Sequence, residues 1–180
     1  ATWHLTPTSQ ARNNLLNEGL VSDNIFTVGN TVIDALLWAS SKLDEESALS
    51  NSIKSSFTFS LPFDLEEDEY ILITGHRREN FGTGIEQICK AIKSLAVSHS
   101  KMHFVYPVHL NPKINDPVRK TLSGLPNVYL IPPQDYLAFV FLLKHSHIVL
   151  TDSGGIQEEA PTLGKPVLVM REVTERPEGV

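Results

Sequence analysis

Short apolar runs of four or five residues recur along the chain from residue 70 onward. They are continuous rather than alternating, which is typical of strands buried on both faces of a parallel sheet. The predicted strands are 70–74, 102–106, 128–131, 147–151 and 166–170. The predicted helices between them are about 84–98, 115–123, 135–144 and 154–163. This alternation predicts right-handed βαβ units, and hence an α/β fold with a doubly wound, Rossmann-like parallel sheet.

The residues before this repeat follow a less regular pattern. Residues 8–18 predict a short capped helix that Gly19 ends, and residues 25–28 predict a strand. Asn30 is the expected N-cap of a second helix that runs to about Leu43. This part of the chain therefore predicts a lead-in segment to the main repeat.

Residues 44–69 change in character, because Ser, Asp and Glu dominate and Pro62 interrupts the segment. Its aromatic residues, Phe57, Phe59 and Phe63, suggest an edge docked on the domain. We therefore expect a linker-like insertion. The predicted organisation is a single domain over 1–180, with a lead-in segment at 1–43, the insertion at 44–69 and the main βα units at 70–180.

Composition then limits the class of protein. The chain has 180 residues, 41% of them hydrophobic and 20% charged, as expected for one well-buried globular domain. A formal net charge of -6 argues against nucleic-acid binding, which needs clustered Lys and Arg. The longest apolar run, 136–143, is far shorter than the ~20 residues that span a membrane.

Cys89 is the single cysteine, so the sequence excludes an intrachain disulfide and a cysteine zinc cluster, and it fits a reducing cytoplasm. The first residues lack the basic and apolar pattern of a signal peptide. Because the chain does not begin with Met, we expect it to be part of a longer protein.

Polar residues follow the predicted strands at the point where each strand ends. His76 and Arg77 follow the first strand, His109 the second, Gln134 the third and Ser153 the fourth. The carboxyl ends of parallel strands lie at one edge of the sheet, where ligands bind in doubly wound folds. The sequence therefore predicts a shared ligand site at this edge.

The turn after the fourth strand has the composition of a phosphate site. The apolar run stops at Asp152, and Ser153 is the expected N-cap of the following helix. Gly154 and Gly155 would let a ligand approach backbone N–H groups at the positive end of that helix. Glu159, one and a half turns further on, could accept hydrogen bonds from two ribose hydroxyls. A solvent-facing side chain fits the spacing of Glu159 equally well.

Two weaker patterns favour ordinary structural interpretations. Gly82 and Gly84 precede a helix, but Gln87 stands where a dinucleotide-binding motif needs its third glycine, so a turn is favoured. His145 and His147 flank a helix end and a strand start, where a partly buried pair is favoured over a metal site. The sequence therefore predicts no metal.

Several long motifs, in the same order, resemble the bacterial non-hydrolysing UDP-N-acetylglucosamine 2-epimerases. They are GNTVID at 29–34, TGHRREN at 74–80, TDSGGIQEEAP at 151–161, GKPVLVMR at 164–171 and TERPE at 174–178. The resemblance covers nearly the whole chain. It implies the second half of a two-domain architecture like that of the glycosyltransferase-B enzymes, with an N-terminal catalytic domain and a C-terminal tail outside this chain.

The resemblance also implies roles for matched residues. Ser153, Gly154 and Gly155 would hold the pyrophosphate, Glu159 the ribose, Gln134 and Phe139 the uridine side, and His76 with Arg176 the diphosphate near the reacting sugar. Arg77 and His109 match positions that line an allosteric site for a second UDP-N-acetylglucosamine. His76 would act on the leaving-group side of catalysis, while the acid and base carboxylates would lie outside this chain. The chain alone is therefore expected to be inactive.

The family reaction converts UDP-N-acetylglucosamine to UDP-N-acetylmannosamine by eliminating UDP and adding it back. The resemblance implies no cofactor, a full-length homodimer, and a role in supplying surface polysaccharide synthesis. Three alternatives remain: a hydrolysing epimerase, the donor-binding domain of a glycosyltransferase, and a non-catalytic nucleotide-sugar sensor. Arg77 and His109 favour the non-hydrolysing enzyme.

Overall fold

The computed structural model describes residues 1–75 and 82–174, and the chain separates into two compact units, Ala1–Trp38 and Ala39–Val180. The separation differs from the single domain predicted over 1–180. The reason is that the first strands pair with each other in a sheet of their own and not with the five-stranded sheet.

The first unit contains one parallel pair of strands joined through a helix. Its elements are β1 (His4–Thr6), α1 (Ser9–Asn17), a 3-10 turn (Ser22–Asn24) and β2 (Ile25–Thr27). Thr8 caps α1 by accepting the N–H of Ala11 at 3.1 Å. The helix and β2 confirm the prediction, whereas β1 was not predicted because its sequence, HLT, contains a single large apolar residue and so no apolar run.

Two helices follow in the sequence. The first is α2 (Thr31–Glu45), and Asn30 caps it as predicted, since its side chain accepts the N–H of Val32 at 3.2 Å. The second is α3 (Ser47–Ser56), which lies inside the segment predicted to be linker-like. That prediction is wrong for α3, because a helix rich in Ser shows little apolar periodicity in the sequence.

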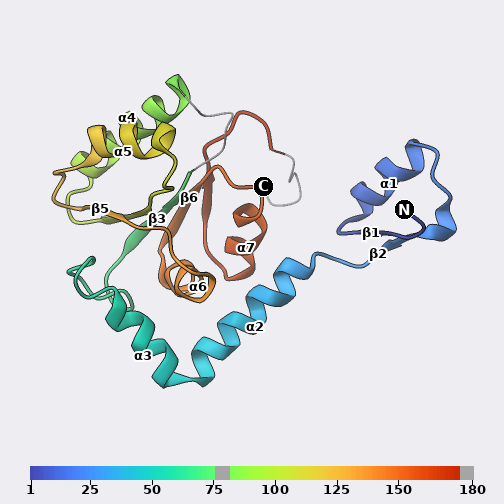
Figure 1. Cartoon of the computed structure of the whole chain (residues 1–180), viewed down its shortest axis with the longest axis horizontal. Helices are drawn as coiled ribbons and strands as arrows, with labels where there is room; N and C mark the ends of the chain where they lie inside the picture. Colours follow the sequence, from blue (N-terminus) through green and yellow to red (C-terminus); the bar gives the residue numbers. More distant parts are fainter. Residues whose placement is uncertain (76–81, 175–180) are drawn as a thin grey trace. The chain divides into compact units, whose positions relative to one another are not determined.

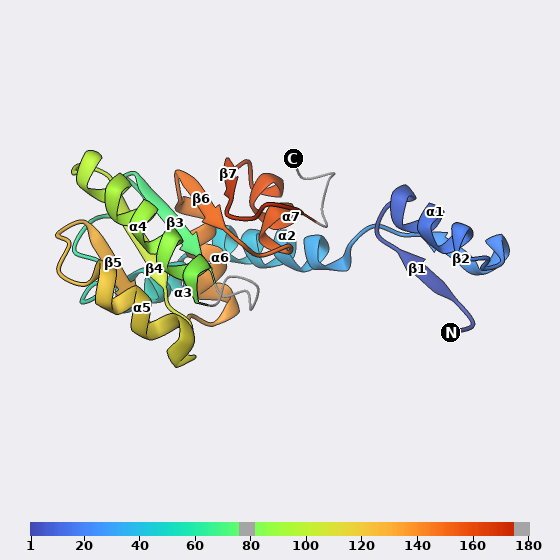
Figure 2. The same cartoon turned by 90° about the horizontal axis from the view of Figure 1, so that it is seen from above.

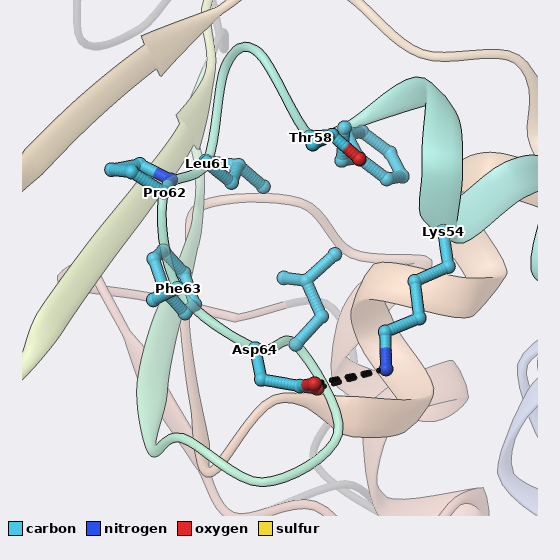
Figure 3. A pocket seen from close by; sticks show the side chains of 8 residues that line it. Lys54, Thr58, Leu61, Pro62, Phe63 and Asp64 are labelled. Atoms are coloured by element: carbon cyan, nitrogen blue, oxygen red, sulfur yellow. Dashed lines mark hydrogen bonds and ion pairs between the residues drawn. The ribbon is translucent and has the colours of Figure 1, made fainter.

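The rest of the segment 44–69 also packs closely. Phe57, Leu61 and Leu65 are buried, and Phe63 stacks on the ring of His103 with 4.0 Å between centroids. Phe59, in contrast, is fully exposed. This loop forms a pocket of about 500 Å³ beside α3, and the ammonium group of Lys54 lies 2.9 Å from the carboxylate of Asp64. Figure 3 shows the side chains that line this pocket.

The second unit is built on a five-stranded sheet in which every described pair is parallel. Its strands are β3 (Tyr70–Thr74), β4 (His103–Pro107), β5 (Val128–Ile131), β6 (Ile148–Thr151) and β7 (Val167–Val169). Its helices after β3 are α4 (Thr83–Ser98), α5 (Pro112–Leu122), α6 (Tyr136–His145) and α7 (Ile156–Thr162). All five strands and all four helices confirm the predicted elements, with shifts of a few residues at their ends.

Helices cover both faces of this sheet, which confirms the doubly wound α/β prediction. In Figures 1 and 2, α4 and α5 lie together over one face, while α6 lies on the other. Ile73 and Phe104 face the α4–α5 layer, where they join a core with Ile92 and Val118. Tyr70 faces the opposite layer, because its hydroxyl donates to the carbonyl of Leu142 in α6 at 2.6 Å. The alternation follows the two-residue period of a strand.

The strand order, β5-β4-β3-β6-β7, reverses direction between β3 and β6. The chain moves outward from β3 to β5, and then returns to the other side of β3 to place β6 and β7. A ligand crevice is expected beyond the carboxyl ends of the two strands that flank such a reversal. These ends are Thr74 and Thr151, which are register partners.

Candidate functional site

A cavity of about 280 Å³ lies beyond the carboxyl ends of the strands at this reversal point. Four separate stretches of the second unit form its walls. Its lining residues are Thr74, Gly75, Pro107, His109, Pro133, Gln134, Phe139, Ser153 and Ile156. The structure thus brings together four of the residues predicted for the ligand site: His109, Gln134, Phe139 and Ser153.

Buried hydroxyl groups join the two central strands beneath this cavity. The hydroxyls of Thr74 and Thr151 lie 2.5 Å apart, and the Thr151 hydroxyl also accepts the backbone N–H of Ser153 at 3.0 Å. The N–H of Asp152 donates to the carbonyl of Thr74 at 3.1 Å. Because buried and fully bonded polar groups are costly to move, this network fixes the start of the turn after β6.

The turn from Ser153 to Gly155 differs in one respect from the prediction. The N-cap of α7 is Gly155, and the predicted N-cap, Ser153, makes no side-chain capping bond. Ser153 instead uses its backbone carbonyl, which accepts the N–H of Gln157 at 3.4 Å. The turn takes up two glycine residues before the helix begins, so the hydroxyl of Ser153 is too early in the chain to cap it.

The glycines leave backbone donors available at this turn. Within the described parts of the chain, the N–H groups of Gly154 and Gly155 have no protein acceptor. Gly154 is buried and Gly155 is exposed. Unused N–H groups beside a cavity are suitable donors for phosphate oxygens.

Glu159 is buried, with 9% of its surface exposed, so the solvent-facing alternative for this residue is wrong. Burial raises the pKa of its carboxyl group above the ordinary value, and the nearby charge of Glu158 adds to this effect. Its carboxylate lies close to the turn, since Oε1 is 3.7 Å from the position that a Cβ on Gly155 would take. Among the described residues, no donor satisfies this carboxylate. A ligand with hydroxyl groups could do so.

Gln134, in the loop before α6, and Phe139, in the first turn of α6, also line the cavity. The side chain of Gln134 donates to the carbonyl of Pro132 at 2.6 Å, and Asp135 caps the helix by accepting the N–H of Ala138 at 2.9 Å. Phe139 is half-buried at the cavity wall. A partly covered aromatic ring beside an amide can bind the flat, polar edge of a nucleobase.

Comparison with known proteins identifies the family of this chain. The family model for UDP-N-acetylglucosamine 2-epimerase matches residues 1–180. The chain belongs to the UDP-N-acetylglucosamine 2-epimerase family. A probable UDP-N-acetylglucosamine 2-epimerase from Ralstonia solanacearum is 52% identical over 180 residues, which are 100% of this chain and 47% of that protein. The UDP-N-acetylglucosamine 2-epimerase of Escherichia coli K12 is 51% identical over 180 residues, which are again 100% of this chain and 47% of that protein. The chain thus spans about half the length of these curated relatives.

Solved structures of epimerases have the same fold. The crystal structure of the Neisseria meningitidis UDP-GlcNAc 2-epimerase bound to UDP-GlcNAc matches with a TM-score of 0.92 and 49% identity. The match covers 99% of this chain and 47% of that one. The Methanocaldococcus jannaschii epimerase in complex with UDP-GlcNAc and UDP matches with a TM-score of 0.81 and 30% identity, over 99% of this chain and 48% of that one.

Three residues to which the epimerase motifs assign roles, His76, Arg77 and Arg176, lie outside the described residues. Over 1–75 and 82–174, no group of three or more His, Cys, Asp or Glu side chains is arranged to hold a metal ion. Every helix in the same ranges is too short or too polar to cross a membrane. The assigned positions that the structure describes are therefore Gly154, Gly155 and Glu159, together with the four residues that line the cavity: His109, Gln134, Phe139 and Ser153.

Two buried side chains that support the cavity, Tyr106 and Gln157, were not predicted from the sequence. The hydroxyl of Tyr106 donates to the carbonyl of Gly75 at 2.8 Å, and burial raises the pKa of this phenol. A Cβ on residue 75 would lie 3.1 Å from that hydroxyl, so a glycine allows the approach. The Tyr106 bond joins residues that are distant in the sequence, and Gln157 lies within α7. Neither side chain therefore has a local signal in the sequence.

The Tyr106 hydroxyl should contribute measurably to stability. In Tyr106→Phe, the buried Gly75 carbonyl loses its donor, so the free energy of unfolding should fall by about 1–2 kcal/mol. Urea denaturation would measure the change. Tyr129→Phe is the matched control, because the Tyr129 hydroxyl makes only a 3.3 Å contact with His103 and is partly exposed. Equal losses in the two variants would contradict the assignment.

Proposed function

We propose that this chain is the UDP-binding half of an isomerase that interconverts UDP-N-acetylglucosamine and UDP-N-acetylmannosamine. It would form the second half of a two-domain, glycosyltransferase-B-like architecture. The observation that carries the proposal is the glycine turn that Ser153 begins at the edge of the cavity beside β3 and β6. Within the described residues, the N–H groups of this turn have no protein acceptor, and Gly155 lies close to the buried carboxylate of Glu159. Relatives of the same fold were crystallised with UDP-GlcNAc or UDP, which supports a nucleotide-sugar ligand for this cavity.

The binding roles follow from the chemistry of each wall. Backbone N–H groups of Gly154 and Gly155, with Ser153 at the start of the turn, would bind the diphosphate. The Glu159 carboxylate would accept hydrogen bonds from the ribose hydroxyls. Phe139 and Gln134 would cover the uracil ring.

The proposed reaction breaks the bond between C1 of the sugar and the diphosphate oxygen while a base removes the proton on C2. Negative charge then develops on the departing UDP, and donors already aimed at the diphosphate stabilise it more in the transition state than in the substrate. We assign His76 and Arg176, from the family motifs, to the same side of the reaction. Addition of UDP back to the glycal, with protonation of C2 on the other face, gives the epimer. The carboxylates for both proton transfers would come from outside this chain.

Other features of the proposal come from the resemblance. Arg77 and His109 would line an allosteric site for a second UDP-N-acetylglucosamine, and His109 lies on the cavity wall as a neighbour of Gln134. The backbone N–H of Asn111 donates to Nδ1 of His109 at 3.1 Å, which orients the imidazole. The enzyme would act in the cytoplasm as a homodimer without a cofactor.

Titration of the 180-residue chain with UDP tests the proposal. We expect a dissociation constant in the high micromolar to millimolar range, because the opposing half of the cleft adds contacts that this chain lacks. Calorimetry would measure it, with ADP as the control ligand that keeps the diphosphate and ribose but changes the base. Absence of heat with millimolar UDP, on protein shown to be folded by circular dichroism, would reject a preformed site.

Turnover separates the epimerase from its alternatives. The 180-residue chain should not convert UDP-N-acetylglucosamine, because acid–base groups worth ~10²–10⁴-fold each are assigned elsewhere. The full-length enzyme should produce UDP-N-acetylmannosamine, observed by NMR, without net release of UDP. Free N-acetylmannosamine with UDP would indicate the hydrolysing enzyme, and a requirement for an acceptor would indicate a glycosyltransferase.

A further inference from the structure

Gln157 is a fully buried polar side chain next to the glycine turn, with no surface exposed. Its side-chain amide nitrogen donates to the backbone carbonyl of Ser153 at 3.3 Å. Its amide oxygen accepts the hydroxyl of Thr174 at 2.5 Å. Gln157 therefore joins the turn that follows β6 to the segment that follows β7.

The buried position of Gln157 is chemically demanding. A buried amide is costly unless both its donor and its acceptor are bonded, and here both have partners. α7 also buries the apolar residues Ile156 and Ala160 and the carboxylate of Glu159, so Gln157 is one of two polar side chains that this helix buries. A glutamate could not replace it, because a second carboxylate oxygen would face the Ser153 carbonyl where the amide now donates.

The bond to Ser153 has a geometric consequence for Gly154. The carbonyl of Ser153 and the N–H of Gly154 belong to one planar trans peptide group, in which they point in opposite directions. The main-chain bond from Gln157 to this carbonyl is long, at 3.4 Å, and the side-chain bond adds a second donor on the same oxygen. Holding the carbonyl toward α7 therefore holds the N–H of Gly154 away from it.

We propose that Gln157 is a positioning residue for the diphosphate site: its amide fixes the Ser153–Gly154 peptide group so that the Gly154 N–H is aimed at a phosphate oxygen. Thr174 acts with it, because its hydroxyl occupies the amide oxygen and so keeps the amide nitrogen directed at Ser153. This inference rests on the proposed function, since it assigns the aimed N–H to the diphosphate of UDP.

The test compares UDP with uridine, which shares the base and ribose but has no phosphate. In the 180-residue chain, Gln157→Leu should weaken UDP binding about fivefold, the order of magnitude of one hydrogen bond, and change uridine binding less than about twofold. Thr174→Val should show the same selective loss to a smaller extent, and Thr174→Ser, which keeps the hydroxyl, should bind UDP like the wild type. Gln87→Leu, at an exposed position of α4, is the control.

Calorimetry for UDP, NMR titration for uridine and thermal unfolding of each variant give distinct outcomes. A loss of affinity for UDP and uridine alike would indicate general damage to the turn and overturn the positioning role, as would unchanged UDP affinity. If Gln157→Leu does not fold, the pair Thr174→Val and Thr174→Ser decides, because Thr174 is only half-buried. Failure of the folded wild type to bind UDP would instead reject the proposed function, and this inference with it.

Discussion

Replacing Glu159 by glutamine should weaken UDP binding about tenfold and, at neutral pH, raise the unfolding temperature of the protein without ligand. The loss of affinity is expected because a carboxylate makes stronger hydrogen bonds to hydroxyl groups than an amide oxygen does. The gain in stability is expected because Glu159 is buried beside Glu158 and has no donor among the described residues. In the full-length enzyme, the defect should appear mainly as a raised KM, since ribose contacts change little during the reaction.

The gain in stability should depend on pH. The pKa of Glu159 in the folded protein lies above the ordinary value of 4.5, so protonation favours folding. This contribution is fully present below pH 4.5 and is lost as the pH rises through the raised pKa. The glutamine variant should therefore exceed the wild type in unfolding temperature at neutral pH and lose that advantage in acid.

Glu158→Gln is the matched control for this experiment, because Glu158 is the neighbouring carboxylate and is more exposed. It should leave UDP affinity nearly unchanged. Thermal unfolding between pH 4 and 8, with calorimetry for UDP, measures both effects. A glutamine variant at position 159 that binds UDP like the wild type would remove this residue from the site.

Arg176→Lys in the full-length enzyme should lower kcat about tenfold to a hundredfold. The prediction rests on the family motif at 174–178, which assigns Arg176 to the diphosphate near the reacting sugar. A lysine keeps the positive charge but cannot reproduce the planar, two-pronged contact of a guanidinium group with phosphate oxygens. Because charge develops on the diphosphate as UDP departs, the loss should appear in kcat more than in KM.

Steady-state kinetics on this variant would be compared with Arg119→Lys. Arg119 lies on α5, where its side chain donates to Asn115 at 2.8 Å and is exposed to solvent. That control should retain wild-type kinetics. If Arg176→Lys also kept both kcat and KM, Arg176 would pair with a neighbouring glutamate and would not contact the diphosphate.

The main sheet could be predicted from the sequence because each strand is a continuous apolar run and helical segments separate these runs. Buried strands such as 70–74 carry this signal in their own residues, so no knowledge of the fold is needed. The elements that were not predicted lack such an apolar pattern. The strand β1, with the sequence HLT, contains a single large apolar residue, and α3 contains five serines among its ten residues.

The site was only partly predictable. Gln134 and Ser153 were correctly predicted to lie at one site, because both follow parallel strands, whose carboxyl ends lie at the same edge of the sheet. Spacing alone could not decide whether Glu159 is buried, since that depends on how the glycine turn directs α7. The phosphate role of the glycine turn and the ribose role of Glu159 were predicted from the residues themselves, whereas the roles of Gln134 and Phe139 came from the resemblance to the epimerases. All of these roles stay predictions.

The supporting contacts could not be predicted from local patterns. Tyr106 reaches Gly75 across 31 residues of sequence, and Thr174 reaches Gln157 across 17. Each contact depends on which strands are neighbours in the sheet and on where the following loops turn. The sequence identifies the residues but gives no distance between them.

The arrangement of the cavity affects how this protein can change in evolution. Most of the cavity wall comes from strand-end loops, whereas most of the core comes from strand and helix interiors such as Phe104 and Ile92. Loop substitutions can therefore alter ligand preference while the core stays intact. Tyr106 and Gln157 are exceptions, because each is fully buried and also bonded to a cavity-lining backbone. At these two side chains, selection for folding and selection for binding act on the same atoms.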